Sequence, residues 1–308
     1  MPSLRSAFVA LSRNRPLRRF CEHSHLGTRL SSRFVAGLEP EDALRVAHSL
    51  NRQGMAATLD SLGESVTTEH EAHQAAEIYH RLLDSIAARK LNANISVKLT
   101  QLGLDLSPAL AESVLASLVE HAASTGNFVR IDMEGSALTQ ITLDILRRLH
   151  SVPRLRPAVG VVIQAYLYRS QADVEQLLAD EIRVRLCKGA YNEPPEVAFP
   201  RKSEVDQSFL LLSSMLLDSS VSHAFATHDE VIVGAIKALA VQQKISPHSF
   251  EFQLLYGVRR DLQRRLTAEG YNVRVYVPFG REWYPYFMRR LAERPANVLF
   301  LARNLIRM

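Results

Sequence analysis

The chain has 308 residues, of which 47% are hydrophobic and 22% are charged, and its formal net charge is +5. This composition is typical of a globular protein with a sizeable core, arranged as one large domain or two smaller ones. No stretch approaches the ~18 uninterrupted apolar residues of a transmembrane helix. The two cysteines, Cys21 and Cys187, cannot form a disulfide framework, which indicates a reducing, cytoplasmic compartment.

Positive charge is concentrated only near the N-terminus, where residues 1–20 contain five arginines and no acidic residue. We expect residues 1–35 to form a basic N-terminal helical segment. The same composition fits an organelle transit peptide or a segment that contacts anionic lipid. Elsewhere many arginines lie beside acidic residues, without the clustered basic and aromatic patch of a nucleic-acid-binding protein, so no nucleic acid is expected as a partner.

Eight short apolar or β-branched runs alternate with amphipathic helical patterns along the rest of the chain. The runs are 55–60, 95–99, 128–133, 159–166, 182–188, 223–228, 250–255 and 273–277. Because no G-x-G-x-x-G follows the first run, this alternation favours a (β/α)8 barrel over a doubly wound sheet. We predict that residues 36–308 form a single α/β domain, a TIM-type barrel, with additional outer helices at 39–54 and 67–91.

Candidate functional residues follow from the rule that barrel active sites lie at the carboxyl ends of the strands. Lys98, Asp132 and Arg185 interrupt apolar runs, and buried charges are costly unless they are paired. Strand residues alternate between two faces, so some of these side chains could instead point toward the helices. The other polar candidates near strand ends are Gln164, Tyr166, Lys188, Thr227, His228, Glu251, Gln253 and Tyr276.

Two turns could hold a phosphate group. In "LCKGAYNEPPE" (186–196), the sequence Lys188-Gly189-Ala190 offers backbone N–H groups and a positive charge after a strand. In "ATHD" (226–229), Thr227 and His228 could hold phosphate or ribose hydroxyls, or Asp229 could simply cap the next helix. The histidine spacings complete no metal motif, so no metal site is expected. Cys187 is interpreted as structural.

A helix with two adjacent arginines lies close to the C-terminus, in "YPYFMRRLAERP" (284–295). Helical spacing brings Tyr286, Arg289, Arg290 and Glu293 to one face. Such a face can be solvated surface or a receptor for an anion. From these residues alone, two other functions stay open: a Schiff-base lyase or aldolase that uses Lys98 or Lys188, and an arginine-rich nucleic-acid-binding protein.

Five strings in chain order resemble the proline dehydrogenase family of flavoenzymes: "VRLCKGAYNEPPE", "FATHD", "FEFQLLYG", "VRVYVPFG" and "YFMRRLAERPAN". The resemblance runs from about residue 58 to 304, and the chain length matches the monofunctional bacterial form. It implies a distorted (β/α)8 barrel with non-covalent FAD and a C-terminal helix that caps the active site.

The resemblance also implies the reaction, which is oxidation of L-proline to Δ1-pyrroline-5-carboxylate, the first step of proline degradation to glutamate. Hydride passes to flavin N5, and the electrons pass on to a membrane quinone, ubiquinone or menaquinone. This would give the basic N-terminus a peripheral contact with the cytoplasmic face of the inner membrane. The oligomeric state stays open.

The family's functional residues match positions in this chain. The resemblance makes Asp132 and Arg185 the catalytic residues, with Arg185 near flavin N5. It assigns the proline carboxylate to Lys98, Arg289 and Arg290, with Glu293 as partner of one arginine. Tyr276, Tyr286 and Leu254 or Leu255 would form the wall around the proline ring. The flavin and its phosphates would contact Met133, Gln164, Lys188, Gly189, Ala190, Thr227 and His228.

Overall fold

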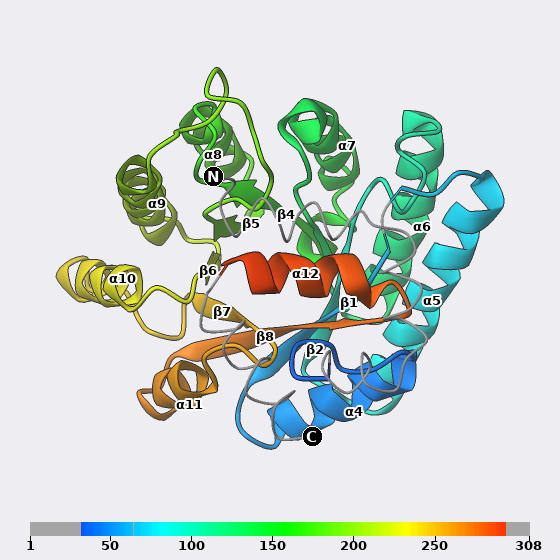
Figure 1. Ribbon diagram of the computed structural model, residues 1–308, viewed down its shortest axis with the longest axis horizontal. Helices are drawn as coiled ribbons and strands as arrows, with labels where there is room; N and C mark the ends of the chain where they lie inside the picture. The colour runs from blue at the N-terminus through cyan, green and yellow to red at the C-terminus, as the bar shows by residue number, and fades with distance from the viewer. Residues whose placement is uncertain (1–31, 64, 294–308) are drawn as a thin grey trace.

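The computed structural model describes residues 32–63 and 65–293, and the side chains of 289–293 fall outside the described part. Eight parallel strands close into a barrel in chain order (Figure 1). Each strand overlaps one of the eight predicted runs, so the predicted α/β barrel is confirmed. The strands are β1 (Ala56–Ser61), β2 (Ala93–Val97), β3 (Val129–Ile131), β4 (Val159–Gln164), β5 (Arg183–Cys187), β6 (Ala224–Ala226), β7 (Glu251–Leu255) and β8 (Asn272–Phe279).

An outer ring of helices connects consecutive strands (Figure 1). The helix predicted at 67–91 is present as α5, but it is the regular connection between β1 and β2 rather than an additional helix. Short 3-10 turns, η1 (Ser136–Leu138) and η2 (Arg156–Ala158), precede α7 and β4. The connecting helices are α5 (Glu69–Ala88), α6 (Pro108–Ser124), α7 (Thr139–His150), α8 (Ser170–Ala179), α9 (Lys202–Leu217), α10 (Glu230–Gln242) and α11 (Arg260–Ala268).

Two further helices distort the barrel. The helix after β8, α12 (Trp283–Glu293), lies across the carboxyl end of the barrel rather than beside its last strand (Figure 1). The outer position next to β8 is taken by α4 (Pro40–Asn51), which precedes β1 and packs against both β1 and β8. The predicted additional helix at 39–54 is therefore present, and the C-terminal helix covers the mouth of the barrel as expected.

Side chains alternate strictly between the two faces of the strands. The outward residues, such as Leu59, Ile95 and Val97, are fully buried against the helices in the main apolar core. The inward residues are unusually polar for a barrel, whose interior is normally filled by branched apolar side chains. They include Thr58, Asp60, Asn94, Ser96, Arg130, Gln164, Arg185, Glu251, Gln253, Arg274 and Tyr276. Because buried polar groups must be paired, this interior specifies a network of hydrogen bonds and ion pairs.

The predicted basic segment 1–35 lies almost entirely outside the described residues, which begin at Ser32. Within the described part of the chain, no helix combines the length and the apolar character that crossing a membrane requires.

Candidate active site

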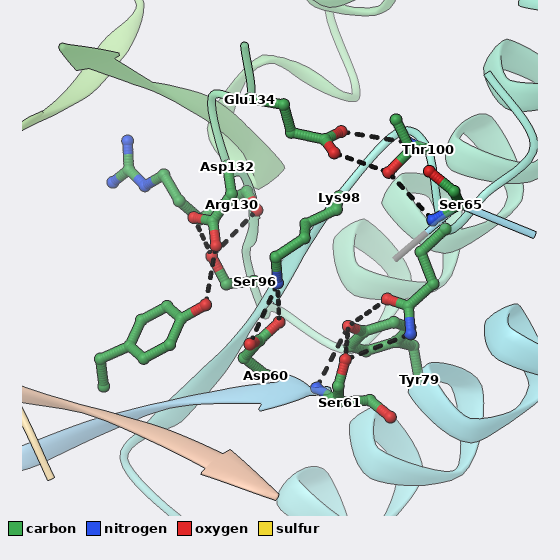
Figure 2. A network of polar contacts seen from close by, with 12 residues as sticks. Asp60, Ser61, Ser65, Tyr79, Ser96, Lys98, Thr100, Arg130, Asp132 and Glu134 are labelled. Atoms are coloured by element: carbon green, nitrogen blue, oxygen red, sulfur yellow. Dashed lines mark hydrogen bonds and ion pairs between the residues drawn. The ribbon is translucent and has the colours of Figure 1, made fainter. Parts of the chain in front are cut away.

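A buried ion pair joins the ends of the first two strands at the mouth of the barrel. Asp60 is the penultimate residue of β1, and Lys98 follows β2 directly. Lys98 Nζ donates to both carboxylate oxygens of Asp60, at 2.9 and 3.1 Å (Figure 2). Only 1% of Asp60 and 9% of Lys98 are exposed. Low solvent access makes this contact much stronger than a surface ion pair, and it fixes the position of the ammonium group.

Lys98 stays protonated in this environment. Burial by itself would lower the pKa of Lys98, but the charges of Asp60 and Asp132 outweigh burial, and the pKa lies above its ordinary value. For Asp60, burial raises the pKa and the charge of Lys98 opposes that rise. A lysine that forms a Schiff base needs a lowered pKa, so this geometry argues against Lys98 as the nucleophile of a lyase or aldolase.

Asp132 is the centre of a second set of contacts, and it lies one residue beyond β3. Its Oδ1 accepts hydrogen bonds from Ser96 at 2.7 Å and from Arg185 Nη1 at 2.9 Å. Its Oδ2 accepts from the Tyr276 hydroxyl at 2.8 Å. The Arg185 guanidinium also lies 5.4 Å from the centre of the Tyr276 ring. Residues from β2, β5 and β8 thus converge on one carboxylate inside the barrel.

Tyr276 acts as a hydrogen-bond donor here. Burial, followed by the negative charges of Asp132 and Asp60, raises the pKa of Tyr276 well above its ordinary value. The phenol therefore keeps its proton and donates a hydrogen bond to Asp132. Together, Lys98, Arg185, Asp60 and Asp132 carry two positive and two negative charges, so this part of the mouth is balanced by the protein alone.

Arg185 has donors to spare. It is 4% exposed, and Nη1 is used by Asp132 and by Ser96, the latter at 3.1 Å. Its Nε and Nη2 atoms are buried and have no acceptor within the described residues. A buried guanidinium with unused N–H groups is costly, so an acceptor-rich group is expected to fill the adjacent space. The edge of a flavin ring, with its carbonyl oxygens and ring nitrogens, has this chemistry.

The turn after β5 adopts a conformation that only glycine accommodates. Gly189 has φ +121°, and a Cβ atom there would lie 2.3 Å from the ring of Tyr166. The backbone N–H of Ala190 donates to Gln164 Oε1 at 3.3 Å, and the Gln164 amide donates to the carbonyl of Glu134 at 2.9 Å. These hydrogen bonds join the end of β4 to the turn after β5.

Lys188 is already paired in the protein. Its ammonium contacts Asp206 at 2.6 Å and Asp229 at 3.0 Å, and Lys202 shares both carboxylates. Two lysines and two aspartates thus form a neutral cluster beside the Lys188-Gly189-Ala190 turn. The ammonium has three N–H donors, so one stays available for a phosphate beside the two carboxylate contacts.

The remaining predicted residues lie at the same end of the barrel. Met133 lies two residues past β3 and is buried. Thr227 and His228 follow β6; Thr227 Oγ1 accepts from the Asp229 N–H at 3.2 Å, and His228 Nε2 accepts from the Leu255 N–H at 2.9 Å. Asp229 also caps α10, as the sequence suggested.

The described side chains of the C-terminal helix are mostly buried. Tyr286, Phe287 and Met288 are all buried, so the described part of α12 has no exposed polar face. The ring of Phe287 lies 6.1 Å from that of Phe34 and 5.6 Å from that of Trp283, and all three belong to one apolar cluster. The side chains of Arg289, Arg290 and Glu293 lie outside the described residues.

Other assignments from the sequence need correction. Glu251 is the first residue of β7 and pairs with Arg274 at 2.9 Å, so it lies at the amino end of the barrel, away from the mouth. Burial raises the pKa of Cys187 to about 12, so its side chain stays a protonated thiol and is a poor nucleophile. This agrees with the interpretation of Cys187 as a structural residue. Within the described residues, no His, Cys, Asp and Glu cluster could hold a metal ion.

Three contributors were missed by the sequence analysis. Asp60 pairs with Lys98, Ser96 joins Asp132 to Arg185, and Glu134 binds the N–H and hydroxyl of Thr100 at 3.1 and 2.6 Å (Figure 2). A signal for Asp60 was present, because it is a charged residue at the end of the first apolar run and shares the inward face of Thr58.

Comparison with known proteins identifies the family. A family model described as "Proline dehydrogenase" matches residues 43–303. Proline dehydrogenase 1 of Bacillus subtilis is 42% identical over 305 residues, which cover 99% of each chain. Proline dehydrogenase of Deinococcus radiodurans is 38% identical over 287 residues, or 90% of each chain.

Solved structures agree with this match. The crystal structure of proline utilization A from Bdellovibrio bacteriovorus, inactivated by N-propargylglycine, is 27% identical, with a TM-score of 0.82 over 94% of this chain. The present chain spans about a third of that protein's length, 35%. The barrel, the convergence of polar residues at its mouth and the sequence identity across nearly the whole chain lead to one conclusion: this chain belongs to the proline dehydrogenase family.

Proposed function

We propose that this chain oxidises L-proline to Δ1-pyrroline-5-carboxylate with non-covalently bound FAD at the carboxyl end of the barrel. The reaction removes a hydride from C5 and a proton from nitrogen, and a C=N double bond forms. The observation that carries the proposal is Arg185, whose buried Nε and Nη2 groups lack an acceptor within the described residues, in a chain of the proline dehydrogenase family. FAD, when bound, would supply the hydride acceptor.

The substrate carboxylate is assigned to Lys98, Arg289 and Arg290. Lys98 and Arg185 are already balanced by Asp60 and Asp132, so a bound carboxylate needs further positive charge. The two arginines of α12 would supply it, since this helix crosses the mouth (Figure 1). Guanidinium groups bind carboxylates in a bidentate geometry, and each charge-assisted hydrogen bond is worth roughly 1.5–3 kcal/mol. Glu293 is proposed as the partner of one arginine.

The other assigned residues orient the groups of the site or form the walls around the substrate. Asp132 holds the Arg185 guanidinium and the Tyr276 hydroxyl in fixed positions, which leaves the Tyr276 ring as one wall of the proline site. Tyr286, buried in α12, would form part of the lid that excludes water. For the flavin we propose contacts with Met133, Gln164, Lys188, Gly189, Ala190, Thr227 and His228, from four successive strand ends.

The test is spectroscopic. Purified protein should show flavin absorption, and L-proline added without oxygen should bleach it and release a cyclic imine that o-aminobenzaldehyde traps. Arg185→Met should retain the fold but lose most of the rate of bleaching, while Arg154→Met, on the surface beside Glu120, should behave like the original chain. A protein that binds no flavin, or whose flavin L-proline leaves oxidised, contradicts the proposal.

An inactivator gives a second test. Because N-propargylglycine inactivated the Bdellovibrio bacteriovorus proline utilization A, we expect it to inactivate this chain as well, with protection by L-proline. Inactivation that L-proline does not slow would argue against a shared site.

Electron transfer to a membrane quinone, ubiquinone or menaquinone, is part of the proposal, as is peripheral contact with the inner membrane. Reduction of a soluble quinone analogue by L-proline tests the first. Sedimentation with vesicles that contain anionic lipid tests the second, and binding only to uncharged vesicles would contradict an electrostatic contact.

A further inference from the structure

A polar cavity lies at the opposite end of the barrel from the candidate active site. Its volume is about 410 Å³. It is lined by the inward residues at the starts of the strands, together with the loops that enter those strands. The charged lining residues are Arg130 in β3, Arg183 in β5, Glu251 in β7 and Arg274 in β8.

One of the three arginines is neutralised inside the protein. Arg274 Nε donates to both carboxylate oxygens of Glu251, at 2.9 and 3.0 Å. Within the described residues, Arg130 and Arg183 form no ion pair with a carboxylate. Instead both guanidinium groups lie over the ring of Phe128, at 4.6 and 5.4 Å from its centre. Three arginines and one glutamate line the cavity, so its described lining carries a net charge of two positive units.

Arg130 is held rigidly in this position. It is 4% exposed, and its Nη1 donates to the carbonyls of Val161 at 3.2 Å and Arg183 at 2.7 Å. Gly160 leaves the space for it, because a Cβ atom there would lie 2.9 Å from Arg130 Nη1. Its Nε is buried without an acceptor in the described part of the chain. A fixed, desolvated guanidinium of this kind is a preorganised receptor for an oxyanion.

Neighbouring titratable groups respond to this positive field. Burial, and then the charge of Arg185, lower the pKa of Arg130 well below its ordinary value; the charge of Glu251 opposes this shift, and Arg274 and Arg183 add to it. Burial, and then the charges of Arg130 and Arg183, lower the pKa of His223 to about 3. His223 is therefore neutral at physiological pH and adds no further charge, while Glu251 is engaged by Arg274.

We propose that this cavity is a binding site for a small oxyanion of the inorganic phosphate class, held between Arg130 and Arg183. A net charge of two positive units in the lining matches an anion with one or two negative charges. The planar guanidinium groups can each donate two parallel N–H bonds to its oxygens. The site is distinct from the mouth, where Lys98, Arg185, Asp60 and Asp132 balance one another.

The experiment is a calorimetric titration of the FAD-loaded protein with inorganic phosphate, in which chloride keeps the ionic strength constant. We expect saturable binding of one phosphate per chain. Arg183 is exposed at the start of β5, so Arg183→Gln should fold normally, and it should weaken phosphate binding at least tenfold. Arg183→Glu should abolish it. Arg154→Gln, which removes a surface arginine outside the cavity, is the matched control and should bind phosphate unchanged.

A thermal shift provides an independent readout, because a ligand that binds only the folded state raises its Tm. Phosphate should raise the Tm of the original chain and of Arg154→Gln, but not that of Arg183→Glu. The proposal is overturned if binding is absent or unsaturable, or if both Arg183 variants bind phosphate as the original chain does. Phosphate binding that the FAD-free protein shows and the FAD-loaded protein lacks would place the ion at the flavin site and would equally overturn the proposal.

Discussion

The contact between Asp60 and Lys98 illustrates how single residues determine the chemistry of the mouth. Lys98 alone, buried at the end of β2, would tend to lose its proton, because burial disfavours charge. Asp60 reverses that tendency, so the ammonium is available to bind an anion. Asp60 itself points at Lys98 rather than at the space the substrate would fill, and we interpret it as a positioning residue.

Asp60→Asn should therefore alter the pH dependence of proline oxidation. Without the aspartate charge the pKa of Lys98 falls. The decrease of kcat/KM for proline at alkaline pH should therefore begin at a lower pH than in the original chain. We also expect the KM for proline to rise at least tenfold, because Lys98 without its partner is no longer held as a charged ligand for the substrate carboxylate. Steady-state kinetics across pH measure both effects.

The control for this change is Asp261→Asn, which removes an exposed carboxylate beside Arg259. It should leave the pH profile unchanged. An alkaline limb in Asp60→Asn identical to that of the original chain would show that Asp60 has only a structural role.

Arg289 is proposed to bind the carboxylate of proline. If it binds the proline carboxylate, Arg289→Met should raise the KM for proline by a factor of ten or more, because charge-assisted bonds are lost, while flavin content stays near normal. Arg281→Met, which removes an exposed arginine paired with Glu39, is the control. Flavin loss with an unchanged KM would count against the assignment; flavin content and KM are read from the absorption spectrum and initial rates.

At the scale of elements, two helices have exchanged roles relative to a regular barrel. Because α4 occupies the outer position beside β1 and β8, α12 is displaced to the mouth. There it is anchored by a separate apolar cluster that includes Trp283, Phe287, Phe34 and Val258. The lid is thus attached by side chains that contribute nothing to the main core, which lets lid and barrel respond separately to mutation.

Trp283→Ala should detach α12 more than it unfolds the barrel. Trp283 is 1% exposed, and truncation of a buried tryptophan costs roughly 3–5 kcal/mol. We expect a large rise in the KM for proline with nearly unchanged far-UV circular dichroism. Trp283→Phe is the matched variant: its ring keeps the packing and removes an indole N–H that has no acceptor within the described residues, so its cost should stay below about 1.5 kcal/mol. Equal KM values in the two variants would refute the anchoring role.

At the scale of the whole molecule, charged side chains are buried inside the barrel, and the apolar core lies between the strands and the outer helices. Burial would raise the pKa of Glu251, but the charge of Arg274 and its hydrogen bond lower it below the ordinary value, so this buried pair makes the interior sensitive to acid. His223 contributes in the same direction. It accepts a hydrogen bond from the Val184 N–H at 3.1 Å through Nδ1, a bond that protonation would break.

Stability should therefore fall as the pH is lowered. His223 has a pKa of about 3 in the folded chain and about 6.5 when exposed. Its contribution is fully present above about pH 6.5 and is lost as the pH falls toward 3, because the unfolded chain then binds an extra proton. The loss is on the order of a few kcal/mol, since one pKa unit corresponds to about 1.4 kcal/mol.

Thermal unfolding between pH 7 and pH 4 measures this dependence. The Tm of His223→Gln should vary less steeply with pH than that of the original chain. The exposed His248, replaced by glutamine, should leave the slope unchanged. If all three slopes coincide, the buried imidazole is not a source of the acid sensitivity.

Much of the fold and part of the site could be predicted from the sequence. Local periodicity located all eight strands, because outward strand residues must be apolar to pack on helices. Lys98, Asp132, Arg185 and Tyr276 were found because charged or phenolic groups near strand ends stand out in apolar runs. Asp60 and Ser96 were missed because their importance depends on partners 38 and 36 residues away, Lys98 and Asp132.

The sequence by itself determined the barrel, its family and the residue types at its mouth, since strand patterns and ordered motifs are local properties. Only the tertiary structure decided which charges pair, that α4 and not α12 closes the outer ring, and that Glu251 belongs to the opposite end from the candidate active site. The physical reason is that ion pairs and helix positions arise from contacts between distant segments. Such contacts are decided when the barrel closes, not by neighbouring residues along the chain.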